Sequence, residues 1–337
     1  MKRIFITGIS GYIGSHCAAQ LLQKDYWVKG SLRDMAYAPQ IQNALNKVVN
    51  KDCNIDFYPL DLLRDDGWEE ALEGCDTVLH VASPFEISEP KNPDDMIKPA
   101  LDGTKRVLSI SKKMGIKKVI LTSSLVAMVG DKKVAHLTDK SWTKPDTDRV
   151  SSYMKSKAYA EKWAWDFYTK QSNDDKMQLT VINPGPVYGP PIINRIDGAS
   201  MSFFAEVMTG KMAQLPPCEY AMSDVRDIAK IHVEAINNSQ SDGKRLIVTT
   251  DEAHSFLDIG KLLSTHGFLK KAPTQAPIFL LKLLGLFNRE IKGMMPFIGS
   301  RITADNSITK HIFNWEPIPF EKMVLDTAES LTKHLHQ

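Results

Sequence analysis

Tyr153 and Lys157 stand four residues apart in the segment "YMKSK", which puts both side chains on one face of a helix, one turn apart. A lysine ammonium beside a phenol favours the phenolate and lowers the phenol pKa from about 10 towards neutral pH. A phenol tuned in this way can give a proton to a carbonyl oxygen or take one from an alcohol. A surface contact on an amphipathic helix has the same spacing, so the surroundings of the pair must decide between the two interpretations.

Two serines precede this helix at a place where a ligand could reach them. Ser123 and Ser124 end the segment "VILTSS", whose apolar run is typical of a buried strand. Ligands of a doubly wound sheet bind beyond the carboxyl ends of its strands. A serine hydroxyl there could donate a hydrogen bond to an oxygen on which negative charge develops, although serines are also common in turns and helix caps.

The segment "TGISGYIG" at residues 7–14 spaces three glycines as Gly8, Gly11 and Gly14. An apolar strand pattern, "KRIFIT", precedes it and a helical pattern follows it, which is the order that a dinucleotide site requires. In such a site, the amides at the helix start and the helix dipole bind a pyrophosphate. A glycine turn that only lets the helix pack on the strand is the alternative.

Strands and helices alternate over the first half of the chain, which predicts an α/β fold with a doubly wound parallel sheet. The expected strands are 2–7, 26–33, 53–61, 76–83, 116–124, 177–185 and 244–250, and helical patterns such as 39–49, 67–74, 96–114, 153–171 and 224–238 separate them.

Proline and glycine become dense from about residue 186, in "GPVYGPPIINRIDG". This irregular segment indicates the start of a second, smaller lobe. We expect a dinucleotide-binding domain over residues 1–185 and 220–253, and a sequence-discontinuous substrate lobe over 186–219 and 254–337.

The composition excludes several classes of function. A chain of 337 residues with 42 Lys and Arg against 40 Asp and Glu offers no basic surface for nucleic acid. Its four cysteines have neither CxxC spacing nor a histidine pattern for zinc, so we expect reduced thiols and no metal. No signal peptide precedes the first strand, which indicates a cytoplasmic protein. The apolar segment 276–287 is shorter than a membrane span, and we expect a buried helix, a cap on the substrate site or a contact with a partner there.

Six motifs together resemble the extended short-chain dehydrogenase/reductases: "TGISGYIG", "HVASPF", "KPALDGTKRVL", "VILTSS", "YMKSK" and "NPGPVYGP". The similarity covers most of the chain, and within the superfamily it is greatest to the dihydroflavonol-4-reductase-like branch of NADPH-dependent carbonyl and aldehyde reductases. It implies a Rossmann fold and hydride transfer between a nicotinamide and a carbonyl. By this resemblance, Tyr153 is the general acid, Lys157 lowers its pKa and binds the nicotinamide ribose, and Ser124, or alternatively Ser123, orients the carbonyl.

The resemblance also implies the residues that bind the cofactor. They are Gly8, Ser10, Gly11, Tyr12, Ile13 and Gly14 in the glycine turn, Asp61 and Leu62 at the adenine, Val81, Ala82 and Ser83 along the cofactor, Pro184, Gly185 and Val187 near the nicotinamide, and Tyr153 and Lys157 themselves. One position departs from the family pattern: "ALDGT" has Ala100 where many relatives have an asparagine, so a proton relay through that asparagine is not expected.

The segment "GSLRD" bears on the choice of nicotinamide. An NAD site usually has an acid at the end of the second strand, for the ribose hydroxyls. Here Arg33 comes first, and its guanidinium can bind the 2′-phosphate of NADP. Asp34 follows directly, so a shift of one residue would favour NAD, and a solvated turn is a third possibility. We expect NADP.

The substrate site is expected to be apolar, as suits a small uncharged carbonyl compound. The candidate contacts are Phe85, Val126, Met128, Tyr188, Ile192, Phe203 and Phe204, with Arg195 as a single charge. Reduction of an aldehyde, ketone or dihydroflavonol-like compound is the favoured function. A nucleotide-sugar epimerase or dehydratase, a hydroxysteroid-type dehydrogenase and a redox-sensing binding protein are the alternatives. The oligomeric state is not predicted.

Overall fold

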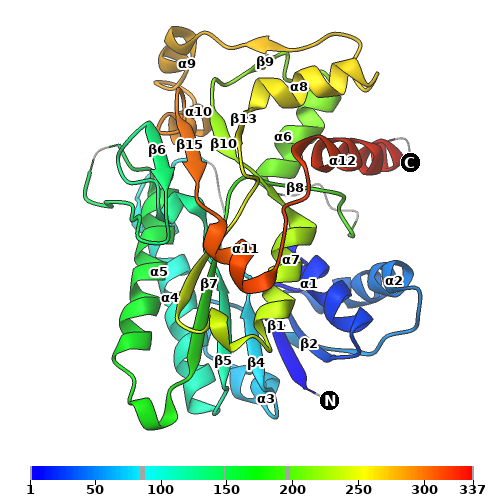
Figure 1. The fold of residues 1–337 in the computed structure, drawn as a ribbon, viewed down its shortest axis with the longest axis vertical. Helices are drawn as coiled ribbons and strands as arrows, with labels where there is room; N and C mark the ends of the chain where they lie inside the picture. Colours follow the sequence, from blue (N-terminus) through cyan, green and yellow to red (C-terminus); the bar gives the residue numbers. More distant parts are fainter. Residues whose placement is uncertain (1, 84–87, 148, 194–197, 336–337) are drawn as a thin grey trace.

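The computed structural model describes residues 2–83, 88–147, 149–193 and 198–335. Figure 1 shows a large sheet with its helices in the lower part of the view and a smaller lobe above it.

Within these residues a seven-stranded parallel sheet has the order β12-β7-β5-β4-β1-β2-β3. Its strands are β1 (Arg3–Thr7), β2 (Trp27–Leu32), β3 (Ile55–Pro59), β4 (Thr77–His80), β5 (Lys118–Thr122), β7 (Gln178–Pro184) and β12 (Lys244–Val248). Each lies inside one of the seven segments predicted from the sequence. The predicted doubly wound α/β fold is therefore confirmed.

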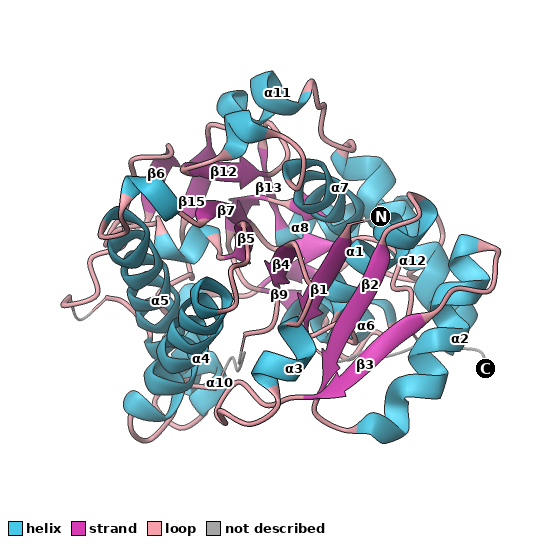
Figure 2. Ribbon diagram, turned by 90° about the horizontal axis from the view of Figure 1, so that it is seen from below, coloured by secondary structure: helices cyan, strands magenta, loops and turns pink. Residues whose placement is uncertain are grey.

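Helices cover both faces of this sheet (Figure 2). They are α1 (Tyr12–Gln23), α2 (Ala38–Val49) and α7 (Val225–Ala235) on one face, and α3 (Trp68–Leu72), α4 (Asp94–Lys113) and α5 (Ser152–Thr169) on the other. Because successive side chains of a strand point to opposite faces, Ile4 and Ile6 of β1 join the core with α1 and α7, whereas Phe5 joins the core with α3 and α4. Burial on both faces explains why the strands are apolar runs rather than alternating patterns.

The chain order reverses between β1 and β4, which are neighbours in the sheet although two strands separate them in sequence. Such a switch point opens a crevice beyond the carboxyl ends of the strands. The glycine turn follows β1, and Val81 to Ser83 follow β4. The fold therefore brings the two segments together at this crevice.

The smaller lobe has its own four-stranded sheet, in the order β13-β10-β15-β6. Its strands are β13 (Ala253–Ser255), β10 (Glu219–Ala221), β15 (Arg301–Ala304) and β6 (Val134–Leu137). The helices α6 (Ala199–Met208), α8 (Phe256–Thr265), α9 (Ile278–Leu284), α10 (Arg289–Met294) and α12 (Phe320–Leu335) lie around it (Figure 1). Strand β6 comes from within residues 1–185, so this part of the expected large domain contributes to the second sheet.

Short elements complete the fold. Two pairs of parallel strands are β8 (Val187–Tyr188) with β11 (Ser223–Asp224), and β9 (Gln214–Leu215) with β14 (Thr274–Gln275). Helix α11 (Ser307–Phe313) contacts β12 of the large sheet. The 3₁₀ turns are η1 (Met35–Tyr37), η2 (Leu125–Ala127), η3 (Asn173–Asp175) and η4 (Ser239–Ser241).

The apolar segment 276–287 does not form a buried helix, which was one of the three structures expected for it. Phe279 is 75%, Leu286 75% and Phe287 84% exposed. Five of the seven residues of α9 are exposed, and Leu280 and Leu281 are half-buried. Among the residues that the structure describes, none of the helices is both long and apolar enough to cross a membrane.

Candidate active site

The glycine turn is a tight connection between β1 and α1, and two of its glycines are required by close backbone approach. Gly8 has a φ of +69°, and a Cβ there would lie 2.9 Å from Cβ of Ala82. A Cβ on Gly14 would lie 2.2 Å from the carbonyl oxygen of Gly8. The Gly8 amide donates to Ser31 Oγ of β2 at 2.9 Å, which ties the turn to the neighbouring strand.

Gly11 has a different role, because its position is open. It is the N-cap residue of α1 and is exposed. It has no side chain to accept hydrogen bonds from the first-turn amides, and the first amides of a helix have no partner within it. The amides of Tyr12 and Ile13 are therefore suited to bind an anion, and the helix dipole adds to the attraction.

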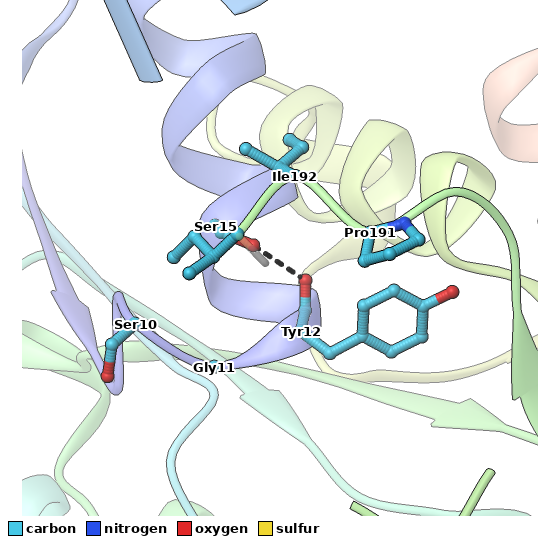
Figure 3. A pocket seen from close by; sticks show the side chains of 7 residues that line it. Ser10, Gly11, Tyr12, Ser15, Pro191 and Ile192 are labelled. Atoms are coloured by element: carbon cyan, nitrogen blue, oxygen red, sulfur yellow. Dashed lines mark hydrogen bonds between the residues drawn. The ribbon is translucent and has the colours of Figure 1, made fainter. Parts of the chain in front are cut away.

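A small pocket lies against this turn (Figure 3). It is lined by Ser10, Gly11, Tyr12, Ser15, Pro191, Ile192 and Ile193. Figure 3 shows the Tyr12 ring beside Pro191. The Tyr12 hydroxyl donates to the Gly189 carbonyl at 2.5 Å, so the start of α1 is held to the segment after β8. Ile192, predicted as a substrate contact, lines this pocket instead.

Thr7, the last residue of β1, holds the end of β4 in place. Its Oγ1 accepts hydrogen bonds from the amides of Val81 and Ala82, both at 3.0 Å. It also lies 2.9 Å from Nδ1 of the buried His80. The Val81 and Ala82 backbone is therefore fixed beside Gly8, where the resemblance places the cofactor.

Ser124, Tyr153 and Lys157 come together at the same edge of the sheet. Ser124 follows β5 and caps η2, because its Oγ accepts from the Val126 amide at 3.3 Å. Tyr153 lies in the first turn of α5, and its hydroxyl is hydrogen-bonded to Ser124. Lys157 lies one turn further along the helix and is buried.

The phenol pKa differs from the sequence-based expectation. Burial raises the pKa of Tyr153 to about 12, and the hydrogen bond from Ser124 opposes this rise. Burial also lowers the pKa of Lys157 to about 8, against the field of Glu161. The net direction predicted for the Tyr153 pKa is therefore wrong for the protein by itself, because loss of solvent raises the pKa by more than the Ser124 hydrogen bond lowers it. The phenol consequently holds its proton at neutral pH.

The end of β2 presents Arg33 rather than Asp34. Arg33 is exposed, directly after the last residue of the strand. Asp34 is the N-cap of η1, and its Oδ1 accepts from the Ala36 amide at 2.9 Å. The carboxylate that would favour NAD therefore already has a backbone partner.

The remaining predicted cofactor residues follow the ends of β3 and β7. Asp61 Oδ1 accepts from the Leu63 amide at 2.9 Å, and both Asp61 and Leu62 are half-buried. A Cβ on Gly185 would lie 2.1 Å from the Ala221 carbonyl oxygen. Pro184 ends β7, and Val187 begins β8. All these segments share one edge of the sheet with the glycine turn.

The predicted substrate residues are only partly found at this edge. Val126 is half-buried next to Ser124. Tyr188 and Phe204 are 1% and 0% exposed and pack against each other with ring centroids 5.7 Å apart. They form the core of the smaller lobe rather than the wall of an open site, and we leave them out of the proposed substrate site. Phe85 and Arg195 lie outside the described residues.

The sequence analysis did not identify a buried carboxylate near Ser124, Tyr153 and Lys157. Glu161 lies one turn beyond Lys157 on α5, and its side chain is 0% exposed. It pairs with Arg245 of β12, with Oε1 and Nε 2.5 Å apart. Glu89 was also missed: it accepts hydrogen bonds from the amide and hydroxyl of Ser152, at the start of α5. Neither lies in a local pattern that would have singled it out.

Ala100 lies in α4 and is buried, 4% exposed. Its methyl group cannot relay a proton, as the sequence indicated.

A dinucleotide-binding sheet with a serine, a tyrosine and a lysine at the edge that carries the glycine turn is the arrangement of the extended short-chain dehydrogenases and reductases. The chain belongs to the NAD dependent epimerase/dehydratase family, whose model matches residues 4–248.

Within this family, the chain is similar to three proteins of known sequence or structure. An NADPH-dependent methylglyoxal reductase of Saccharomyces cerevisiae is 30% identical over 270 residues, 73% of this chain and 77% of that protein. A cinnamoyl-CoA reductase of Medicago truncatula is 32% identical over 257 residues, covering 73% and 75%. The crystal structure of Gre2 from Candida albicans in complex with NADPH has a TM-score of 0.77 at 25% identity and covers 99% of both chains.

Proposed function

We propose that this chain catalyses the NADPH-dependent reduction of a small aldehyde or ketone to the alcohol. The observation that carries the proposal is the hydrogen-bonded Ser124 and Tyr153 beside Lys157, at the sheet edge that also carries the glycine turn. The similarity of the chain to proteins named as NADPH-dependent methylglyoxal reductase and cinnamoyl-CoA reductase supports this class of reaction.

The residues at the crevice fit a dinucleotide. The open Gly11 and the amides of Tyr12 and Ile13 would bind its pyrophosphate, and the exposed Arg33 would bind the 2′-phosphate. When bound, NADPH supplies the hydride. Pro184, Gly185 and Val187 would lie near the nicotinamide, and Asp61 and Leu62 near the adenine.

In this proposal, Tyr153 is the proton donor. Its raised pKa keeps the phenol protonated at neutral pH, so the proton is present before the carbonyl oxygen becomes negative. Ser124 donates a hydrogen bond to the same oxygen and stabilises the developing charge. Lys157 lies one turn away, and its ammonium stabilises the phenolate that remains.

Val126 is kept as a substrate contact because it lies two residues after Ser124, donates its amide to Ser124 Oγ and is half-buried. In this proposal, the large sheet binds the cofactor and the smaller lobe encloses the substrate. We also place the enzyme in the cytoplasm, since its four cysteines are free thiols, which suit a reducing compartment.

The test is the Tyr153→Phe variant, with Tyr159→Phe as its control on the same helix. Tyr159 donates to Asp146 at 3.1 Å and lies outside the Ser124 group. We expect Tyr153→Phe to lower kcat by about 100-fold or more while NADPH affinity changes by only a few-fold, and Tyr159→Phe to behave as the wild type. Near-normal turnover by Tyr153→Phe would refute the role of this tyrosine.

The epimerase and hydroxysteroid-type alternatives share the fold and the tyrosine–lysine pair. A nucleotide-sugar epimerase would carry tightly bound NAD and turn over without net consumption of NADPH. Net, carbonyl-dependent NADPH consumption therefore distinguishes the proposed reductase from it.

A further inference from the structure

Glu161 is a fully buried carboxylate whose hydrogen-bonding capacity is used by four partners. Oε2 accepts from Ser123 Oγ at 2.6 Å and from Asn183 Nδ2 at 2.8 Å. Oε1 accepts from Arg245 Nε at 2.5 Å and from Trp165 Nε1 at 3.2 Å. A buried charge is costly unless it is paired in this way, so these contacts hold the carboxylate in one position.

The partners of Glu161 connect it to the loop that carries Ser124. Ser123 is the residue before Ser124, and its amide donates to the Ile182 carbonyl at 2.8 Å. Asn183 donates from the same Nδ2 to the Ser124 carbonyl at 3.2 Å. The carboxylate therefore joins α5 to the ends of both β5 and β7, directly behind the serine.

Arg245 is anchored independently of Glu161. Its Nη1 donates to the carbonyls of Asp139 and Ser141 at 2.8 and 2.6 Å. The guanidinium carbon lies 3.8 Å from the centroid of the Trp142 ring. The side chain is only 7% exposed, so the cation is a fixed point against which Glu161 is held.

Lys157 lies between Tyr153 and Glu161 on the same face of α5, one turn from each. The groups that bear on its charge come from three elements: Glu161 from α5, His80 from β4, and Arg245 of β12 through its pair with Glu161. His80 is neutral, because burial and Lys157 lower its pKa to about 3. Glu161 therefore supplies the negative charge that keeps this buried lysine protonated.

We propose that Glu161, held by Arg245, is a positioning residue of the active site, which fixes the Ser123–Ser124 loop and maintains the ammonium form of Lys157. The proposal rests on the proposed function. It assigns Glu161 no contact with substrate or cofactor: Glu161 acts through Ser124 and Lys157.

The test compares Glu161→Gln with the double variant Glu161→Gln/Arg245→Met. The single variant leaves a buried arginine unpaired and is expected to lose stability. The double variant removes both charges of the buried pair, so we expect it to stay folded, and it lacks the negative charge of Glu161 near Lys157. We expect the double variant to keep NADPH affinity within a few-fold and to lose kcat at least about 10-fold. This loss is smaller than the roughly 100- to 1000-fold effect of removing an oxyanion donor itself, because Ser124 and Lys157 remain.

A second readout does not depend on activity. The pKa of Lys157 is measured by NMR of the labelled lysine ammonium, with the resonance assigned from Lys157→Arg. Loss of an opposite charge one turn away lowers the pKa by about 1 unit or more, and the alkaline limb of the kcat profile moves to lower pH by the same amount.

The matched control is Lys118→Met/Asp242→Asn, which removes another buried ion pair. Lys118 begins β5 and Asp242 precedes β12, so this pair lies at the edge of the sheet opposite the site. Its atoms are 2.5 Å apart, and the Lys118 side chain is 8% exposed. We expect it to change stability but neither kcat nor the Lys157 pKa. A double variant of Glu161 and Arg245 with the wild-type kcat and Lys157 pKa would overturn the proposal. Wild-type protein that consumes no NADPH with any carbonyl would overturn the proposed function instead, and the NMR titration would still decide whether Glu161 controls the charge of Lys157.

Discussion

The substitutions Gly14→Ala and Gly11→Ala are expected to affect different properties of the protein: the first its stability and the second its affinity for NADPH. A Cβ on Gly14 would lie 2.2 Å from the Gly8 carbonyl oxygen and 3.2 Å from the Ile9 Cα, so α1 would have to move away from the turn. We expect Gly14→Ala to cost about 1–3 kcal/mol of unfolding free energy, the usual effect of overpacking. In an ordinary helix the same change would stabilise by about 1 kcal/mol, so the sign itself reports the close approach.

Gly11→Ala meets little resistance within the protein. Gly11 has a φ of −76°, which alanine adopts readily, and its Cβ would have one neighbour within 4 Å, the Gly8 carbonyl oxygen at 3.2 Å. Since Gly11 is exposed and precedes the first amides of α1, we expect the added methyl group to hinder the approach of a pyrophosphate to them. We expect a loss of no more than about 1 kcal/mol of unfolding free energy, because alanine is a poorer N-cap than glycine. NADPH binding should weaken by about 10-fold or more, and that factor corresponds to about 1.4 kcal/mol.

Thermal unfolding without cofactor and fluorescence titration with NADPH separate the two effects. Gly14→Ala should unfold several degrees lower, whereas Gly11→Ala should unfold closer to the wild type and bind NADPH weakly. Wild-type NADPH affinity in Gly11→Ala would refute the assignment of this turn to the pyrophosphate. Wild-type stability in Gly14→Ala would refute the steric argument.

Two further predictions concern the cofactor and the buried histidines. Arg33→Ala should weaken NADPH binding by about 10-fold or more and leave NADH binding nearly unchanged, because a charge-assisted hydrogen bond to phosphate contributes about 1.5–3 kcal/mol. Equal losses of affinity for NADPH and NADH in isothermal titrations would show that Arg33 does not contact the 2′-phosphate. His16, His80 and His232 are buried, and desolvation lowers their pKa values to about 4, 3 and 4. The folded state therefore has its full stability above the unfolded-state pKa near 6.5, where the histidines are neutral, and loses stability as the pH falls towards 4. The loss at pH 5 is about 2 kcal/mol of unfolding free energy for each histidine. Equal unfolding free energies in urea at pH 7.5 and pH 5 would contradict this prediction.

The sheet and the site edge could be predicted from the sequence because their signals are local. Apolar runs mark strands that are buried on both faces, and the glycine spacing marks the turn after the first of them. The carboxyl ends of parallel strands meet at one edge, so residues such as Gly8, Ser124 and Arg33 could be placed together without coordinates.

What could not be predicted depends on contacts between distant segments. Glu161 and Arg245 are 84 residues apart, and neither lies in a motif. Tyr188 and Phe204 have the same apolar character whether they form a core or a pocket wall, and the structure places them in the core. The direction of the Tyr153 pKa shift depends on how fully the phenol is desolvated, which its spacing from Lys157 does not reveal.

The proposed reductase activity is best tested by the absorbance of reduced nicotinamide when the purified protein is mixed with NADPH or NADH and a panel of aldehydes, diketones and dihydroflavonols. A carbonyl reductase of this kind should give oxidation that depends on the carbonyl and is faster with NADPH than with NADH. Absence of oxidation with every carbonyl, in protein that retains bound NAD from purification, would contradict the proposed activity and favour an epimerase.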